Sequence, residues 1–480
     1  MSPFHLKSWR VRNGRMRRRP LVISVLLCGG LGACLVGPNY RRPAVVTTPA
    51  FKEAAGWAPA QPSDAVERKD WWTVFGDPTL DNLEARVNVS NQTLASAEAA
   101  YRQAHALVAQ DRAALFPTVT LDASASQTGS FAGKPHATYQ PSVGASWAPD
   151  IWGAVRRTIE NARGNAQASA AILANARLSA QTELALDYIS LRQLDEEKRI
   201  FDDTVIAYQR SLEVTQNKYQ AGVVARSDVL TAQGQLLNTQ ATDTNLIQLR
   251  ARMEHAIAIL TGEPPATLTL EPTPWNLRLP QIPTSVPSTL LERRPDIAAA
   301  ERSTAAANAL IGVALAAYYP NISLSGQAGF AGSTLGSLFT ASSSFWSLGA
   351  SAAETVFDAG ARGARVRGAR AFFDEAVANY RQTVLTAFGQ VEDNLAAQRV
   401  FGPEEAQLQQ AADVTAANET ITLNEYRAGT IDYTTVVIAQ AAALSARNAL
   451  LSIQASRLIT VVDLIAALGG GWTTADLPKD

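Results

Sequence analysis

The 480-residue chain is 47% hydrophobic but only 7% aromatic, a composition that suits closely packed, alanine-rich helices better than one large globular core. Its formal net charge of −1 hides an uneven distribution, because residues 1–33 carry seven Lys or Arg and no acid. The remaining residues hold 35 basic (42 − 7) and 43 acidic side chains, a net of −8, which excludes the basic footprint of a nucleic-acid-binding protein.

Residues 1–33 are typical of a lipoprotein signal peptide. The arginine cluster precedes LVISVLLCGGLGA, an apolar run too short to span a bilayer. The run ends in Leu-Gly-Ala-Cys, which resembles a bacterial lipobox. We therefore expect a covalent diacylglycerol and an N-acyl chain on Cys34, no other cofactor, and a lipid-anchored N-terminal extension over 34–70. The alternative is a small-residue cleavage site beside an incidental cysteine.

The rest of the chain contains an internal sequence repeat. KYQAGVVARSDVLTAQ (218–233) aligns with EYRAGTIDYTTVVIAQ (425–440) at an offset of 207 residues, and Pro117 aligns with Pro320 at an offset of 203. This period is too long for a solenoid, so it predicts a duplicated unit. The predicted parts are a first repeat, an equatorial linker, a second repeat and a C-terminal tail, at 71–262, 263–289, 290–468 and 469–480.

Each repeat contains two segments in which apolar and polar residues alternate. In the first of them Val119 and Leu121 point one way, whereas Thr120 and Asp122 point the other way. About nine alternating residues suit a tilted membrane-spanning strand. The alternative is a pair of small hairpins that cap a soluble helical core. The predicted strands are 118–126, 139–147, 321–330 and 345–353.

Between the hairpins the sequence predicts very long helices. No proline occurs between Pro149 and Pro264, and one helix over 156–219 would be about 96 Å long. Such a helix needs neighbours along its whole length. Apolar residues at coiled-coil spacing would let each helix pack on such a neighbour, as in the leucines that recur every seven residues at 444, 451 and 458. Small residues on other faces would let each helix pack against two neighbours, as a closed cylinder of helices requires.

The two Tyr-x-Ala-Gly motifs predict tight turns at 219–228 and 426–435, where one long helix ends and a returning helix begins. Gly222 and Gly429 suit a left-handed C-cap. The residues expected to begin the returning helices as N-caps are Ser227, Asp228, Asp432 and Thr434.

Four strands are too few to close a membrane barrel, and open strand edges in lipid leave backbone groups without partners. The barrel must therefore be shared between copies of the chain. Two copies would give eight strands, and three would give twelve with room for a water-filled lumen. The predicted fold class is a membrane β-barrel joined to a long α-helical barrel, and the predicted function is a conduit across the outer membrane and into the periplasm.

Several motifs together resemble the outer membrane factor (TolC-like) family, and within it the efflux lipoproteins of the NodT/OprM type. They are CLVGPNYRRP (34–43), WWTVFGDPTLDNL (71–83), LLERRPDIAAAER (290–302), AAYYPNISLSG (316–326) and the paired turns. The resemblance implies a homotrimer with a twelve-stranded barrel and an equatorial belt that includes 262–275 and the C-terminal segment. It also implies as partners a periplasmic adaptor protein, an inner-membrane pump of the RND or a similar type, and outer membrane lipid.

The function implied by this resemblance is that of the outer membrane channel in a tripartite efflux system. The channel would be a passive duct that exports small molecules such as drugs and toxic compounds. Two alternatives stay open at this point. One is a duct for type I protein secretion, and the other is a structural or adhesive surface lipoprotein without transport.

The resemblance also places a periplasmic gate and the adaptor docking site at the two turns. Asp228 falls at the position of a tip aspartate in the family, and Tyr426 at that of a tip tyrosine. Many relatives carry two acidic residues after the second turn, which form a cation-binding ring. Thr435 and Ile438 stand there instead, so we expect a gate of hydroxyls and apolar contacts. The alternative for the aspartates is simple helix capping. The candidate residues are Tyr219, Gly222, Asp228, Tyr426, Gly429, Asp432, Thr435 and Ile438.

The sequence does not favour an enzyme. Its four histidines are scattered and lack the spacing of a metal site, so no metal is expected. It contains neither a GxSxG motif nor a phosphate-binding loop.

Overall fold

The structure is a computed structural model that describes residues 35–45, 50–53, 70–129, 131, 133, 135–280 and 293–477. The predicted signal peptide (1–33) and Cys34 lie outside the described residues. So do 46–49 and 54–69 of the predicted extension, 281–289 of the predicted linker and 290–292 of the predicted second repeat.

The chain divides into two compact units, which we call the sheet unit and the helical unit. The sheet unit comprises Met1–Asn39, Gln110–Glu160 and Asn308–Arg370, and the helical unit comprises Tyr40–Ala109, Asn161–Ala307 and Ala371–Asp480.

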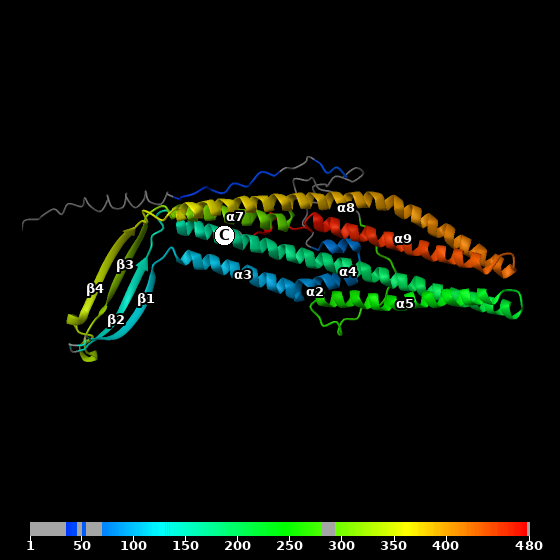
Figure 1. The fold of residues 1–480 in the computed structure, drawn as a ribbon, viewed down its shortest axis with the longest axis horizontal. Helices are drawn as coiled ribbons and strands as arrows, with labels where there is room; N and C mark the ends of the chain where they lie inside the picture. Colours follow the sequence, from blue (N-terminus) through cyan, green and yellow to red (C-terminus); the bar gives the residue numbers. More distant parts are fainter. Residues whose placement is uncertain are drawn as a thin grey trace, which may run out of the picture. The chain divides into compact units, whose positions relative to one another are not determined.

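The order of elements confirms the duplication (Figure 1). After a short helical turn (Trp71–Phe75) and α2 (Pro78–Ser90), the first repeat runs α3 (Gln92–Ala113), β1 (Thr118–Thr128), β2 (His136–Trp147), α4 (Ala154–Gln220) and α5 (Arg226–Leu260). The second runs α7 (Pro295–Ala316), β3 (Asn321–Phe330), β4 (Ser344–Ala353), α8 (Ala361–Ala428) and α9 (Tyr433–Ala467). Corresponding helices have nearly equal lengths, at 22 and 22, 67 and 68, and 35 and 35 residues.

The sheet unit contains one antiparallel sheet in the order β1-β2-β3-β4. All four predicted strands are confirmed, and β1, β2 and β4 are slightly longer than predicted. The register sorts the side chains by polarity, because directly opposed residues share a face. Leu121 lies opposite Val143, and Val143 lies opposite Ala328, so one face is apolar. On the other face, Gln327 donates a hydrogen bond from Nε2 to the Oγ of Ser142 at 2.9 Å.

No described residue covers the edges or the apolar face of this sheet. Within the described residues, β1 and β4 each pair with a strand on one side only. On the apolar face Leu121 is 81% exposed and Leu348 is 80% exposed. A single chain therefore leaves apolar surface and backbone hydrogen-bonding groups uncovered.

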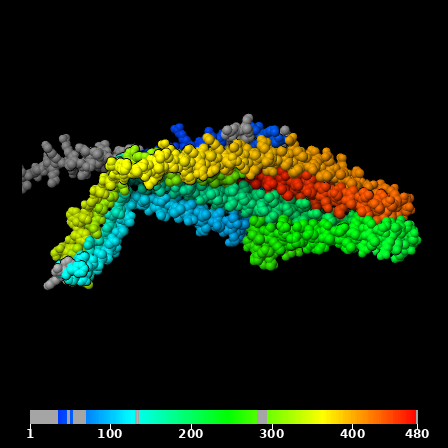
Figure 2. Space-filling model, viewed as in Figure 1, coloured from blue at the N-terminus to red at the C-terminus, as the bar shows by residue number. Residues whose placement is uncertain are grey.

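The helical unit is built from two antiparallel helix pairs. Ion pairs join α4 to α5, at Asp195–Arg250 (2.6 Å) and Lys198–Asp243 (3.0 Å). Others join α8 to α9, at Glu419–Arg447 (2.8 Å) and Glu405–Arg457. In Figure 2, α9 lies between α8 and the α4–α5 pair, and α5 and α9 are in contact. This position explains why α9 is apolar, since many of its side chains are buried between neighbouring helices.

The largest core of the helical unit lies where α2, α4, α5 and α9 meet. Trp71, Phe75 and Leu83 are buried there with residues of α4 such as Leu184. The predicted belt segment also packs on this core. Residues 262–275 form neither helix nor strand, and Leu270 among them is buried against the cluster. Side chains of α4 and α5 hold the backbone of this segment by hydrogen bonds. Arg192 of α4 donates to Glu271 O (2.9 Å) and Arg250 of α5 donates to Leu270 O, while Glu254 of α5 accepts the N–H of Leu270 (2.6 Å).

Candidate functional site

Aromatic side chains mark both ends of the apolar sheet face. At the end where the strands connect to helices, Trp147 donates from Nε1 to Leu115 O (3.0 Å), and Trp152 stacks on Tyr319 with ring centres 4.8 Å apart. At the other end Phe330 and Phe339 pack edge to face, with centres 5.3 Å apart. An apolar band between two aromatic girdles is the pattern of a membrane-spanning sheet.

The first turn joins α4 to α5 through a left-handed glycine. Gly222 has a φ of 74°, its N–H donates to Tyr219 O (2.9 Å), and the N–H of Val223 donates to Lys218 O (2.9 Å). This is the Schellman arrangement expected of the motif. The predicted N-cap at Ser227 or Asp228 is wrong, because α5 already begins at Arg226 after Ala225, which makes no side-chain cap. Asp228 lies instead in the first turn of α5, where its charge favours the helix dipole.

The second turn joins α8 to α9 in the same way, with a φ of 81° at Gly429. Its N–H donates to Tyr426 O (3.0 Å). Here the predicted N-cap Asp432 is confirmed, and the predicted N-cap Thr434 is wrong because it lies inside α9. One carboxylate oxygen accepts both the backbone N–H and the hydroxyl of Thr435, each at 2.9 Å. These hydrogen bonds hold the pKa of Asp432 below its ordinary value.

The two tip tyrosines occupy matched positions but different environments. Tyr219 is 44% exposed, whereas Tyr426 is 1% exposed. The hydroxyl of Tyr426 donates to Thr215 Oγ1 (3.1 Å), which in turn donates to Ser211 O (2.8 Å). Gln440 of α9 donates to the hydroxyl of Ser211 (3.2 Å). This chain of polar contacts ties the α8–α9 pair to the α4 helix.

A lysine completes the contact between the two turns. The ammonium of Lys218 lies 4.1 Å above the ring of Tyr426, and it donates to the carbonyl of the same tyrosine. The ring of Tyr433 packs 5.3 Å away, and burial raises the pKa of both tyrosines. A hollow of about 320 Å³ lies between the turns, and its lining includes Lys218, Asp228, Tyr426, Gly429, Asp432 and Tyr433.

The structure thus brings Asp228, Tyr426, Gly429 and Asp432 together around one hollow, but not the other candidates. Tyr219, Gly222, Thr435 and Ile438 do not line it, and Ile438 is 66% exposed. The sequence motifs do not point to Lys218, Thr215, Ser211 or Gln440 as site residues. One signal was present, since Lys218 aligns with Glu425 in the second copy and so breaks the symmetry of the repeat.

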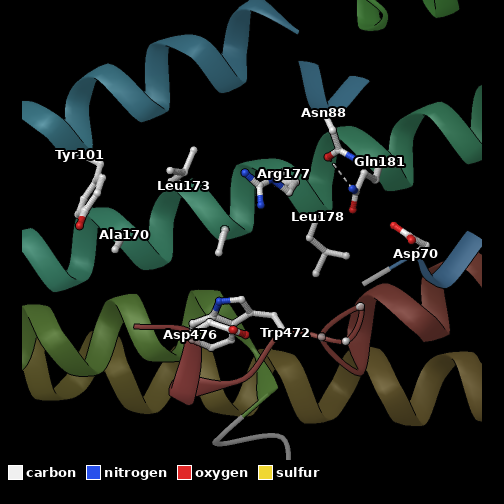
Figure 3. A pocket seen from close by; sticks show the side chains of 14 residues that line it. Asp70, Asn88, Tyr101, Ala170, Leu173, Arg177, Leu178, Gln181, Trp472 and Asp476 are labelled. Atoms are coloured by element: carbon white, nitrogen blue, oxygen red, sulfur yellow. Dashed lines mark hydrogen bonds between the residues drawn. The ribbon is translucent and has the colours of Figure 1, made fainter. Parts of the chain in front are cut away.

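A second hollow, of about 580 Å³, lies within the helical unit (Figure 3). Arg177 and Gln181 of α4 border it on one side, and Trp472 borders it on the other. Gln181 is held by a hydrogen bond from its Nε2 to Asn88 Oδ1 (2.9 Å). The C-terminal side is shaped by three successive glycines, 469–471, with φ of 99°, 58° and 88°. The segment that was expected to join the equatorial belt therefore forms one wall of a cavity.

The three described histidines do not line either hollow. His105, His136 and His255 are all exposed, and His5 lies outside the described residues. Among the residues that the structure describes, no group of three or more His, Cys, Asp or Glu side chains could hold a metal ion.

Comparison with known proteins places the chain among channels. The "Probable efflux pump outer membrane protein TtgC" of Pseudomonas putida is 30% identical over 463 residues, which cover 92% of this chain and 93% of that protein. The "Outer membrane protein OprJ" of Pseudomonas aeruginosa is 30% identical over 95% of this chain and 97% of that protein.

Solved structures of channels share the fold. The outer-membrane channel OprN superposes with a TM-score of 0.85 at 31% identity, over 92% of this chain and all of that one. The open state of the Neisseria gonorrhoeae MtrE outer membrane channel superposes with a TM-score of 0.82 at 26% identity, over 93% of this chain and all of that one. The family model described as "Outer membrane efflux protein" matches residues 85–263 and 286–470. The chain therefore belongs to the outer membrane efflux protein family.

Proposed function

We propose that this protein is the outer membrane duct of a tripartite efflux system, through which small molecules such as drugs and toxic compounds leave the cell. The observation that carries the proposal is the four-stranded sheet, which among the described residues has an uncovered apolar face, an opposite polar face and two unpaired edges. The names of the relatives, which describe efflux pump outer membrane proteins, support it.

The same sheet supports a homotrimer. Unpaired edges in lipid cost several kcal/mol for each backbone group left without a partner, so β1 of one copy should pair with β4 of the next. Three copies give twelve strands, which leave a lumen lined by the polar face, whereas eight strands enclose little more than their own side chains. The side chains that would line this lumen include Asp122, Ser142 and Gln327.

The partners follow from this arrangement. We infer that a periplasmic adaptor docks at the turns between α4 and α5 and between α8 and α9, and that an inner-membrane pump delivers the cargo through it. We also infer that Cys34 carries the lipid anchor, which the lipobox supports.

We further propose that the contacts around Tyr426 keep the periplasmic end closed, without a ring of carboxylates. Thr435 and Ile438 are exposed on α9, and the hydroxyl of Thr435 is bound by Asp432. Thr435→Asp should therefore place a second carboxylate beside Asp432 and create a site for divalent cations. We expect block of the channel by Mg²⁺ or Ca²⁺ to appear in the variant, measured as single-channel conductance in planar bilayers. Unchanged block would show that this residue does not face the constriction.

Conductance of the purified, reconstituted protein also tests the proposed function itself. An efflux duct should form discrete pores, and a deletion strain should become more sensitive to toxic small molecules. A strain that keeps its drug resistance but no longer releases a secreted protein would identify a type I secretion duct instead. A trimer without a pore would identify a structural lipoprotein, and either result would overturn the proposal.

A further inference from the structure

The segment that leads from β4 into α8 forms a hollow with a positive charge that is not neutralised. The hollow measures about 510 Å³ and is lined by Tyr318, residues 358–364 and Arg367. All of these residues belong to the sheet unit. Residues 354–370 contain four arginines and two acids, in a chain whose predicted mature part has a net charge of −8.

One of the arginines is structural. Arg362 donates from Nε to Asp358 Oδ2 (2.7 Å), and its guanidinium lies 5.3 Å from the ring centre of Tyr318. Asp358 also accepts the backbone N–H groups of Gly360 and Arg362, each at 3.0 Å, so it already caps the start of α8. This pair is internally neutral, and it fixes the floor of the hollow rather than offering a free charge.

Arg367 and Arg370 are the free charges. Both are exposed, and within the described residues neither has an acidic side chain within ion-pairing distance. They lie three residues apart on α8, which places them about 60° apart around the helix axis. Both therefore lie on the side of α8 where Arg367 lines the hollow. Arg365 is also exposed, but it lies about 160° from Arg367 and about 140° from Arg370, on the other flank.

Apolar surface adjoins these charges. Val356 and Phe357, just before the hollow, are 94% and 85% exposed, and Tyr318 is 44% exposed. Tyr318 of the hollow is the sequence neighbour of Tyr319, which stacks on Trp152, so the hollow lies at the same end of the strands as that aromatic pair. If the sheet spans the outer membrane as proposed above, this is the periplasmic boundary of the bilayer, because the helices follow the strands at this end. Guanidinium groups bind phosphate in a forked geometry, and aromatic rings prefer the same depth.

We propose that Arg367, Arg370 and Tyr318 form a binding site for the headgroup of an anionic phospholipid in the periplasmic leaflet. The guanidinium groups hold the phosphate, and Val356 and Phe357 contact the acyl chains where these enter the bilayer. The inference rests on the proposed membrane location of the sheet, but it does not require transport.

Native mass spectrometry of the full, detergent-purified protein tests the site. The protein is titrated with dioctanoyl phosphatidylglycerol and, separately, with dioctanoyl phosphatidylcholine. We expect the wild type to prefer phosphatidylglycerol, and each of Arg367→Gln and Arg370→Gln to weaken that binding about fivefold. Arg365→Gln, on the other flank of α8, is the matched control and should keep the wild-type preference. Added salt should reduce the preference, because the attraction is electrostatic.

Three results would overturn the proposal. One is an unchanged lipid preference in the Arg367→Gln/Arg370→Gln double variant, checked for intact assembly by size-exclusion chromatography. The second is release of phosphatidylglycerol by an equal concentration of inorganic phosphate, which would identify a site for free phosphate. The third is a change of ion selectivity in planar bilayers with no change in lipid binding, which would place the arginines in the lumen. Lack of conductance in the wild type would contradict the proposed function, and it would leave the lipid measurement readable.

Discussion

At the scale of single residues, the two turns show how the same motif can acquire two different environments. Tyr219 and Tyr426 stand at matched positions of the two copies, but only Tyr426 is buried and bonded to Thr215. The difference arises from the partners, since Lys218 of the first copy reaches Tyr426 of the second. A sequence read as two repeats predicts the turns correctly, but it cannot show which copy supplies the side chain that packs on the other.

Tyr426→Phe should weaken the contact between the two helix pairs. It removes one hydrogen bond, worth about 1 kcal/mol, and leaves Thr215 its bond to Ser211. If this contact keeps the channel closed, open probability in planar bilayers should rise about fivefold. Tyr219→Phe is the control and should leave it unchanged, because that side chain is 44% exposed. Equal effects of both variants would contradict a gate role for Tyr426.

A buried acid in α2 makes the stability depend on pH. Glu84 is fully buried, and among the described residues neither of its carboxylate oxygens has a hydrogen-bond partner. Burial, assisted by the nearby charge of Asp81, raises its pKa from 4.5 to about 9. Between these values the folded protein keeps a proton that the unfolded chain has released. The contribution of protonated Glu84 to the free energy of unfolding is therefore fully present below pH 4.5, and it is lost as the pH rises through about 9.

Glu84→Gln should remove this dependence, because the amide stays neutral at every pH. We expect the melting temperature of the purified variant, followed by circular dichroism, to fall less than that of the wild type between about pH 6 and pH 9. Glu98→Gln, at an exposed position of α3, should behave like the wild type. Parallel pH profiles for Glu84→Gln and the wild type would show that this carboxyl does not titrate within the folded protein.

At the scale of elements, the period of each pattern was sufficient to predict type and position. Alternation predicted all four strands, and the long proline-free stretch predicted α4. The sequence was less informative about α8, which continues through Pro403, a residue that usually ends or kinks a helix. Here the match to α4 is the better guide, because a duplicated unit needs a helix of equal length. The start of α5 was missed because its N-cap, Ala225, lacks the side-chain oxygen on which the prediction relied.

Neighbouring residues of β4 provide a test of which sheet face meets lipid. Leu348 lies on the apolar face and Ser347 lies on the opposite face. Leu348→Arg should destabilise the inserted barrel by roughly 2–4 kcal/mol, because it places a charge in the hydrocarbon layer. Ser347→Arg should insert normally and change the conductance. The measurements are urea unfolding in vesicles and single-channel recording. Normal stability of Leu348→Arg would contradict the assignment of this face to lipid.

At the scale of the whole molecule, the residues after the predicted anchor are fixed to the protein independently of any lipid. In the sheet unit, the buried Arg157 donates to Val36 O (3.1 Å) and to Gly37 O (3.1 Å). In the helical unit, Tyr40 donates to Glu301 Oε1 at 2.5 Å. These hydrogen bonds involve protein groups alone, so we expect the segment to hold its place without acylation.

Cys34→Ser should accordingly abolish labelling by radioactive palmitate without preventing assembly. We expect the variant to form the same oligomer on size-exclusion chromatography and to conduct in planar bilayers like the wild type. Asn39→Ala is a useful companion, since it keeps the cysteine but removes one acceptor of Arg157 (3.0 Å). Failure of Cys34→Ser to assemble would show that the acyl chains take part in folding, and labelling that persists would place the lipid elsewhere.

The matched helix lengths have one more consequence, for how such a protein can change size. The two turns must lie at the same height along the helices, because Lys218 and Thr215 of the first repeat contact Tyr426 of the second repeat in the same chain. Deleting a single heptad from α4 and another from α5 would draw the first turn back by about 10 Å and separate these partners. The duct can therefore become longer or shorter and keep these contacts only if both repeats gain or lose helical segments of equal length. This requirement links the lengths of the two repeats after the duplication.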